Sequence, residues 1–515
     1  GKKFLVDCGM EQGNDVYENQ ELPIAASDVD CILLTHAHID HSGLIPLMYV
    51  NGFRGQVYST SATAQLCEIM LRDSAHIQMF EAEWRNRKAA RSGGKLKEFV
   101  PLYDMDAAVN VCKQFVGCEY DRVYDIAEGI KIRFTDVGHL LGSASIEVWA
   151  TEKTENGDVT EKIVFSGDIG NINKPIIKDP KHVRDADYVV MESTYGNRSH
   201  GGTPNYVEDL TDIFKRTFER GGNVVIPSFA VGRTQELLYI IRKIKEDNLV
   251  GRDFDVYMDS PLAIEATNIF IKNVESCFDD EAVELVRKGI NPLSFPGLKY
   301  ATTGDESKQI NFDPNPKVII SSSGMCEAGR IRHHLKHNLW RPECTIVFVG
   351  YQAVGTTGRI IVDGAEEIKL FGEPIQIKAE IVQLKGSSGH ADKDGLLCWI
   401  NAFDTKPKKV FVVHGEDSVC DEFTECLKEE YGYDAMAPYT GGSYDLIADR
   451  VISEGVKERK TRRTTSTQRG KTVFDRLVAA GKRLMTVITH NEGGTNKDLA
   501  KFTDQINALC DKWDR

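Results

Sequence analysis

Four residues suited to binding metal ions, His36, His38, Asp40 and His41, directly follow a predicted buried strand over Cys31–Thr35. Neutral imidazole nitrogens and carboxylate oxygens are ligands that Zn²⁺ and similar divalent cations prefer. The spacing places His36 and His38 on one side of the chain and lets Asp40 and His41 turn towards a second cation. A surface histidine cluster is the alternative, but buried imidazoles at this density are costly unless they coordinate a metal. The segment therefore predicts a metal site.

Two more potential ligands stand at the ends of later predicted strands. His139 follows a strand over Ile130–Val137, and Asp168 follows the strand that starts at Lys162. Taken singly, these residues would more often be a buried core histidine and a turn aspartate. With the upstream histidine segment in the same chain, metal ligation by both residues is the stronger interpretation.

The pattern His-x-His-x-Asp-His after a strand, followed by His139 and then Asp168, resembles the metallo-β-lactamase superfamily. The resemblance implies an αββα sandwich with the metal ligands at its strand ends. It also implies that Asp7, at the end of the first visible strand, steadies the ligands without binding the metal itself.

Three later motifs narrow the resemblance to the β-CASP nucleases. Glu192 stands in Met-Glu-Ser-Thr-Tyr-Gly, which resembles motif A, and His390 stands in Ser-Gly-His-Ala-Asp, which resembles motif B. His414, in Val-Val-His-Gly-Glu, resembles motif C, where the RNA-cleaving branch of the family has histidine. The segments 228–234 and 323–325 match the α/β domain that the family inserts between motifs A and B.

The resemblance implies a role for each site residue. It assigns His36, His38 and His139 to one cation, Asp40, His41 and His414 to the other, and Asp168 to both. Two Zn²⁺ ions, with Mn²⁺ as the alternative, would share a hydroxide that attacks the phosphorus atom. His390, oriented by Glu192, is expected to protonate the leaving 3′-oxygen. The expected catalytic residues are therefore Asp40, Asp168, Glu192 and His390.

Weaker signals concern RNA contacts and a second histidine cluster. Small residues before helices expose backbone N–H groups to phosphate, and arginine adds charged contacts. On this basis the predicted RNA contacts are Arg233, Ser323, Gly324, Arg330, Ser387 and Ser388. The basic run from Arg85 to Lys97 is interpreted as a solvated helix face, with a substrate groove as the alternative. A partly exposed helix face is also predicted for His333, His334 and His337, because no acidic or thiolate partner lies at a matching spacing.

The elements that position these residues follow from the hydrophobic pattern. Residues 1–195 are mostly short strands and predict the first part of the sandwich, with its N-terminal strand expected before Gly1. Residues 196–378 alternate strand and helix, which predicts an inserted, doubly wound parallel α/β domain. Residues 379–455 are expected to complete the sandwich. The remainder, 456–515, is predicted as a basic linker, flexible over 461–470, and a helical extension.

Composition bounds the class of protein. Of the 515 residues, 41% are hydrophobic and 27% charged, which is ordinary for a folded protein. The net charge of −14 argues against a protein coated in nucleic acid or bound to an anionic membrane, but it leaves room for a local basic channel. The 12 cysteines include no CxxC pair, and no apolar run reaches about 18 residues. We therefore expect reduced thiols, a cytoplasmic location and no membrane partner.

These observations predict a two-metal, zinc-dependent ribonuclease that acts in RNA processing or decay, with endonuclease favoured over 5′–3′ exonuclease. A thioester or lactone hydrolase of the same fold is disfavoured by the long insertion with Glu192 and His390. A DNA-processing β-CASP nuclease is disfavoured by His414. A catalytically silent RNA-binding subunit is disfavoured because all the candidate ligands are present. RNA is the expected partner, and a homodimer formed through the C-terminal helices is a further hypothesis.

Overall fold

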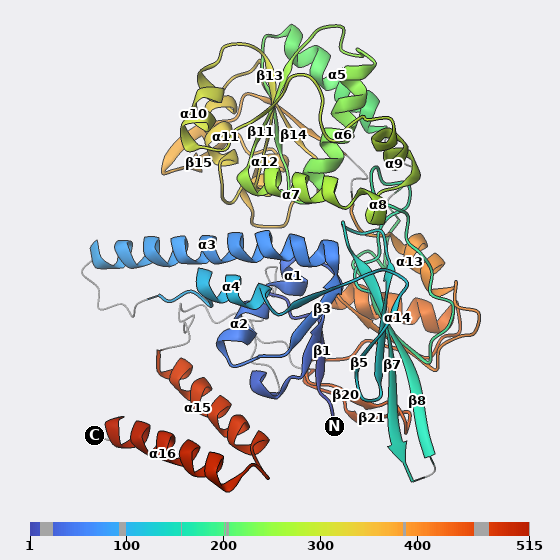
Figure 1. Ribbon diagram of the computed structural model, residues 1–515. Helices are drawn as coiled ribbons and strands as arrows, with labels where there is room; N and C mark the ends of the chain where they lie inside the picture. Colours follow the sequence, from blue (N-terminus) through green and yellow to red (C-terminus); the bar gives the residue numbers. More distant parts are fainter. Residues whose placement is uncertain are drawn as a thin grey trace.

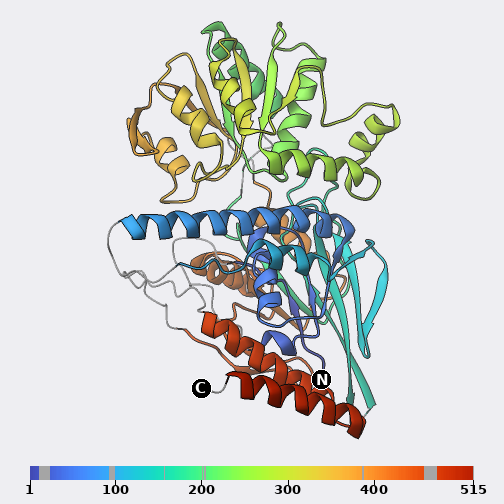
Figure 2. The same ribbon diagram turned by 60° about the vertical axis from the view of Figure 1, so that its left-hand side comes forward.

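The computed structural model describes residues 1–10, 24–91, 99–155, 157–199, 201, 205–384, 388–457 and 473–513. A two-sheet sandwich forms the body of the molecule, and an α/β unit with its own sheet lies above it (Figure 1). Figure 2, turned by 60°, shows the same two layers with the long helix α3 (Ser61–Arg91) running across the junction between them. The predicted class, a metallo-β-lactamase sandwich with an inserted parallel α/β domain, is confirmed.

The first sheet of the sandwich has four parallel strands in the order β1-β2-β3-β4. Their bounds are Phe4–Val6, Cys31–Leu33, Gln56–Thr60 and Phe115–Cys118. Fully buried aliphatic side chains on β2 explain why it forms the interior of this sheet. The surrounding helices are η1 (Ala26–Asp28), α1 (Ile39–Ser42), α2 (Ile45–Val50), α3 and α4 (Met105–Cys112).

The second sheet has seven strands in the order β19-β18-β9-β8-β7-β6-β5. In chain order, β5 to β9 are Val123–Ala127, Ile130–Asp136, Ala144–Thr154, Gly157–Phe165 and Tyr188–Glu192, and β18 and β19 are Lys409–Val413 and Ala435–Met436. Strand β6 buries Ile130, Ile132 and Phe134 and exposes Lys131, as expected of a sheet with one wet face. Helices α13 (Lys393–Ile400) and α14 (Asp417–Glu429) and the hairpin β20–β21 (Ser443–Asp445, Arg450–Ser453) complete this half.

The inserted unit has six parallel strands in the order β12-β11-β13-β10-β14-β17. In chain order they are Val224–Pro227 (β10), Asp255–Asp259, Leu298–Tyr300, Lys317–Ser321, Thr345–Phe348 (β14) and Glu380–Gln383 (β17). Its helices, α5 to α12, are Tyr206–Glu219, Arg233–Glu246, Pro261–Lys272, Val274–Cys277, Asp280–Arg287, Gly304–Phe312, Ile331–Asn338 and Thr357–Val362. A hairpin of β15 (Glu367–Leu370) and β16 (Glu373–Gln376) precedes β17, which pairs with β14 beyond the predicted boundary at 378.

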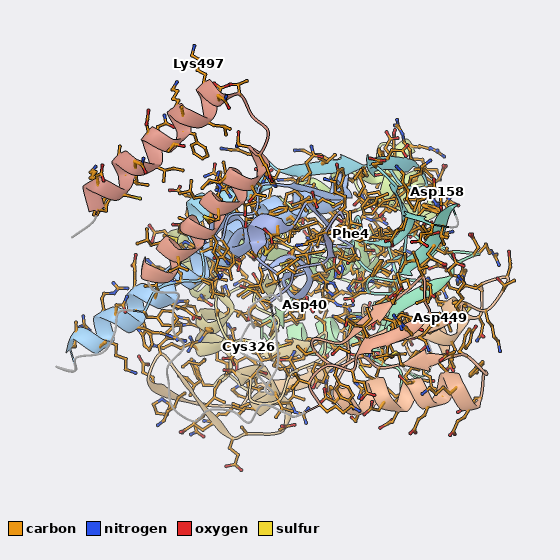
Figure 3. All side chains as sticks on the ribbon, turned by 90° about the horizontal axis from the view of Figure 1, so that it is seen from below. Phe4, Asp40, Asp158, Cys326, Asp449 and Lys497 are labelled. Carbon is orange, nitrogen blue, oxygen red and sulfur yellow. The ribbon has the colours of Figure 1, made fainter. Side chains whose placement is uncertain are left out.

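The C-terminal helices α15 (Val473–His490) and α16 (Asn496–Trp513) form a hairpin beside the sandwich. Seen from below, the hairpin projects to one side of the body, with Lys497 on it (Figure 3). Thr486 Oγ1 on α15 lies 3.1 Å from Ser27 Oγ on η1, and the side chains of α16 include none that are buried among the described residues. The predicted connector 461–470 lies outside the described residues. Nowhere in the described chain is a helix both long and apolar enough to cross a bilayer.

Candidate metal centre

The predicted ligands come from the ends of strands that point to one edge of the sandwich. His36 and His38 follow β2, and Asp40 and His41 lie in the short helix α1 that comes next. The remaining ligands follow three strands of the other sheet: His139 after β6, Asp168 after β8 and His414 after β18. Because the carboxyl ends of parallel strands meet at one edge, residues up to 378 positions apart in the chain come together there.

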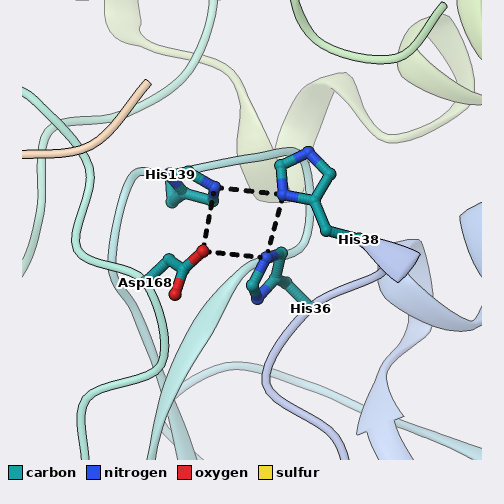
Figure 4. Close-up of side chains that lie close together, drawn as sticks. All are labelled: His36, His38, His139 and Asp168. Carbon is teal, nitrogen blue, oxygen red and sulfur yellow. Dashed lines mark hydrogen bonds and ion pairs between the residues drawn. The ribbon is translucent and has the colours of Figure 1, made fainter. Parts of the chain in front are cut away.

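The first group of ligands is His36, His38, His139 and Asp168, whose potential ligand atoms all lie within 4.8 Å of one another. His38 Nδ1 is 3.0 Å from His36 Nε2 and 3.2 Å from His139 Nε2. Asp168 Oδ2 is 3.4 Å from His36 Nε2 and 3.5 Å from His139 Nε2. Figure 4 shows the three rings and the carboxylate converging on one point.

The second group is Asp40, His41 and His414, which meets the same 4.8 Å limit. His41 Nε2 lies 3.1 Å from His414 Nε2, and His414 Nε2 lies 3.7 Å from Asp40 Oδ2. Asp168 faces this group through its other oxygen, since Oδ1 is 3.2 Å from His41 Nε2. One carboxylate therefore lies between the two groups.

The donor set fits a divalent cation. Asp168 Oδ1 is buried and accepts no hydrogen bond from the described residues, although imidazole nitrogens surround it. Burial lowers the pKa of His36 and of His139 well below the usual range and lowers that of His38 to about 4, so these rings are neutral and can ligate. Burial favours the protonated acid at Asp168, but His41 and His414 hold the pKa of that carboxyl well below its usual value.

Asp7 lies directly behind His41 and orients that ring. Its Oδ2 is 2.6 Å from His41 Nδ1, which turns Nε2 of the ring towards the cluster. Thr35 holds the carboxylate in place, because its backbone N–H donates to Oδ1 and its hydroxyl donates to Oδ2, both at 2.8 Å. Asp7 has a φ of 59°, a left-handed conformation that the surrounding contacts must maintain.

Glu192 and His390 form a pair at the side of the cluster. His390 Nδ1 is 3.3 Å from both carboxylate oxygens of Glu192 and 3.9 Å from Asp168 Oδ2. Glu192 is buried at the end of β9, where the N–H of Ile169 donates to its Oε1 at 2.5 Å. Burial opposes a charged ring, but the carboxylates of Glu192 and Asp168 raise the pKa of His390 above its usual value.

The predicted RNA contacts are spread over several environments. Arg233 pairs at 2.6 Å with Glu236, one turn along the same helix, and Arg330 pairs at 2.7 Å with Asp259, so both guanidinium groups already have an anionic partner. Ser388 Oγ accepts a hydrogen bond from the N–H of His390. The remaining residues are Ser323 and Gly324, in the loop after β13 (Lys317–Ser321), and Ser387, which lies outside the described residues.

The prediction of a partly exposed face is wrong for His334. This ring is fully buried, and its Nε2 lies 2.6 Å from Asp259 Oδ2. Asp259 ends β11 (Asp255–Asp259), 75 residues upstream, so a search for an acidic partner at helical spacing could not find it.

Lys174, which belongs to none of the predicted motifs, links the candidate metal site to the inserted unit. Its Nζ donates to the backbone carbonyl of His139 at 2.8 Å and lies 3.3 Å from Glu236 Oε1 on α6 (Arg233–Glu246). All three side chains are largely buried. Lys174 stands in the loop between β8 and β9, and nothing in the local sequence distinguishes it from a surface lysine.

The sandwich fold and the histidine–aspartate cluster define a metal-dependent hydrolase of the metallo-β-lactamase superfamily. Three family models match the chain: a metallo-beta-lactamase superfamily domain over 1–171, a Beta-Casp domain over 234–361, and a Zn-dependent metallo-hydrolase RNA specificity domain over 374–438. The chain therefore belongs to the β-CASP family of RNA nucleases.

Curated relatives match most of the chain. Ribonuclease TTHA0252 of Thermus thermophilus is 34% identical over 81% of this chain and 88% of its own length. An RNase J-like protein of Methanocaldococcus jannaschii is 31% identical, over 80% of this chain and 87% of the relative. The transcription termination factor FttA of Methanosarcina mazei is 32% identical over 84% of this chain, which spans 66% of that longer protein.

Proposed function

We propose that this chain hydrolyses RNA phosphodiester bonds with two bound Zn²⁺ ions, cutting internally, in RNA processing or decay. The observation that carries the proposal is the pair of ligand groups that share Asp168, one oxygen facing each group, beside the His390–Glu192 pair. The names of the relatives support RNA as the substrate, and the family match to a Zn-dependent hydrolase supports zinc over manganese.

In this proposal the ligands divide between two cations. His36, His38 and His139 hold one, Asp40, His41 and His414 hold the other, and Asp168 serves both. When bound, the cations supply Lewis acidity to a water molecule and to the phosphate oxygens. The chain itself fixes the direction of the ligands, because Asp7 orients His41 and Lys174 fixes the backbone of His139.

His390 is the proposed general acid. Its Nδ1 faces Glu192, which leaves Nε2 to donate a proton to the leaving 3′-oxygen. The buried carboxylate of Glu192 also favours the charged ring, so His390 carries the proton that the reaction consumes. Glu192 is held in turn by the N–H of Ile169, directly after Asp168.

The proposed cellular setting is a reducing cytoplasm. All 12 cysteines are free thiols, most of them buried, which supports the reducing, cytoplasmic environment that the sequence predicts. RNA is the proposed partner, and the exposed C-terminal hairpin is the proposed site of a homodimer contact.

The test uses RNA labelled at the 5′ or the 3′ end, beside DNA of the same sequence, with the zinc-loaded protein. We expect internal cuts in RNA only, abolished by a chelator. His390→Ala should retain its metal and cut RNA about 100- to 10,000-fold more slowly. His490→Ala, which changes an exposed histidine on α15, is the matched control. Uncut RNA, or cleavage by His390→Ala at the wild-type rate, would contradict the proposal.

A further inference from the structure

Helix α3 has one face that packs on the sandwich. Ser74 Oγ lies 2.8 Å from the hydroxyl of Tyr103, and Gln78 Oε1 accepts from the N–H of Leu102. Asn86 exchanges two hydrogen bonds, of 2.8 and 2.9 Å, with the backbone of Phe99. These contacts at positions 74, 78 and 86 fix the rotation of the helix about its axis.

The opposite face presents aromatic rings followed by cations. Phe80 is 59% exposed and Trp84 is 52% exposed, and Arg87 and Arg91 lie one and two turns further on. Spacings of four, three and four residues place these four side chains on one side of the helix. Lys88 joins them, with its Nζ 5.0 Å from the centre of the Trp84 ring. We call these five residues the α3 strip.

The same side of α3 contacts the inserted unit closer to the metal site. Gln65 Oε1 accepts a hydrogen bond from Asn273, at the end of α7 (Pro261–Lys272). Burial raises the pKa of Asp73 on α3, and the nearby charge of Glu265 on α7 raises it further. In Figures 1 and 2, α3 runs below the inserted unit and continues past α7. The α3 strip therefore extends the line of the junction between the two domains.

The N-terminal end of α3 lies beside the metal site. The hydroxyls of Thr60 and Thr63 donate to the carbonyl of Gly142, at 2.6 and 2.8 Å, three residues beyond the ligand His139. At 1.5 Å per residue, Phe80 and Trp84 lie roughly 28 to 35 Å along the helix from that end. A strand that stacks at 3.4 Å per nucleotide needs roughly eight to ten nucleotides to cover this distance.

We propose that the α3 strip binds single-stranded RNA that extends from the metal site, so that the enzyme recognises long substrates in preference to short ones. The inference rests on the proposed ribonuclease function and adds a binding site about ten nucleotides from the cut. Exposed aromatic rings stack on bases, and the neighbouring arginine and lysine side chains pair with phosphates. The strip places two exposed rings next to three cations, and single-stranded RNA offers base faces and phosphates side by side, so the two surfaces complement each other.

The test compares two lengths of oligouridine RNA, which lacks secondary structure. A hexanucleotide cut at its centre is too short to reach the α3 strip, whereas a 24-nucleotide RNA covers it. We expect Phe80→Ala/Trp84→Ala to raise the KM for the longer RNA at least tenfold and to leave kcat/KM for the hexanucleotide unchanged. The single variant Trp84→Phe keeps a stacking ring and should therefore bind the longer RNA nearly as well as wild type.

A second arm measures binding of the 24-nucleotide RNA against salt concentration. Arg87→Gln/Arg91→Gln should reduce the slope of log K against log salt by roughly 1.4, the value for two lost phosphate contacts with a single strand. The controls are Trp513→Ala, which removes an exposed ring next to Lys512 on α16, and Arg450→Gln on β21. Both should behave as wild type.

The outcomes separate this inference from the proposed function. If the wild type cuts both RNAs and the strip variants handle the 24-nucleotide RNA like wild type, the α3 strip is not an RNA site, although the ribonuclease proposal stands. Equal losses with both RNA lengths would also overturn the inference, because they would show a general structural effect. If the wild type neither cuts nor binds RNA, both proposals fail.

Discussion

Asp168 faces both candidate ligand groups, because its two carboxylate oxygens lie near different histidines, and our proposal makes it a ligand of both cations. Asp168→Ala should therefore lose bound metal as well as activity, and elemental analysis of the purified variant would measure this. His390→Ala should keep the wild-type metal content, since the His390 Nδ1 atom lies 3.9 Å from Asp168 Oδ2 and belongs to neither ligand group. Normal metal content in Asp168→Ala would refute the shared role.

Gly9 has no reactive side chain, but it lets the backbone of α1 lie close to the segment that follows β1. A methyl group at this position would lie 1.5 Å from the carbonyl oxygen of Asp40 and 2.5 Å from the N–H nitrogen of His41. Gly9→Ala must push α1 away. We expect it to lower the affinity for the cation held by Asp40, His41 and His414 at least tenfold, while the cation held by the other group remains bound. Metal titration of the chain followed by calorimetry would show this, and two unchanged affinities would contradict it.

At the scale of elements, the loop between β8 and β9 joins the two domains through Lys174. Lys174→Met leaves Glu236 buried with Arg233 as its remaining partner. A buried charge that loses its partner costs about 3–5 kcal/mol, so with one partner kept we expect a loss of about 2 kcal/mol in the free energy of unfolding.

Denaturant unfolding measures this loss, and the double variant Lys174→Met/Glu236→Gln tests its cause. If the loss arises from the unpaired charge, the double variant should recover most of the stability. A double variant that is less stable than Lys174→Met would show that the ion pair is not the reason.

Strand β6 ends in Asp136, just before the loop that carries His139. Burial raises the pKa of Asp136 to about 7. The folded chain therefore holds a proton there that the unfolded chain releases near pH 4, and this contribution to stability falls as the pH rises from about 4 to about 7. Asp136→Asn removes the effect, so its stability relative to wild type should improve by about 2 kcal/mol between pH 5.5 and pH 8. Urea unfolding at the two pH values checks this, and a pH-independent difference would contradict it.

Strand ends were predictable because a buried apolar run followed by His or Asp is a local pattern. The strands before His36, His139 and Asp168 all form, although the strand before Asp168 begins at Gly157 and not at the predicted Lys162. Strands β4 and β5 lack such a pattern, since β4 is mostly half-buried and β5 is an edge strand with only partial burial. Contacts such as Asp259–His334 and Lys174–Glu236 join separate parts of the chain, and spacing in the sequence carries no signal for them.

At the scale of the whole molecule, the C-terminal hairpin exposes several large apolar side chains. Leu477 and Met485 on α15 and Leu509 and Trp513 on α16 are all more than half exposed. If the hairpin forms a homodimer contact, a chain ending at Gly455 should have about half the mass of the full chain in light scattering. Leu477→Ser/Met485→Ser should have the same effect in the full chain. An unchanged mass in both cases would exclude this contact.

The net charge of −14 describes the molecule without its metal ions. Two divalent cations at the cluster would bring it to about −10 and place the positive charge where a phosphate reacts. The charge of the whole chain therefore says little about its substrate, and the local arrangement of ligands decides the chemistry.

The most direct test of the account is the RNA cleavage rate of metal-free protein as Zn²⁺ is added back in measured equivalents. We predict no cleavage without metal, little with the first equivalent, and full activity near two equivalents per chain. Full cleavage of RNA by the metal-free chain would contradict the central claim, as would an activity complete at one equivalent.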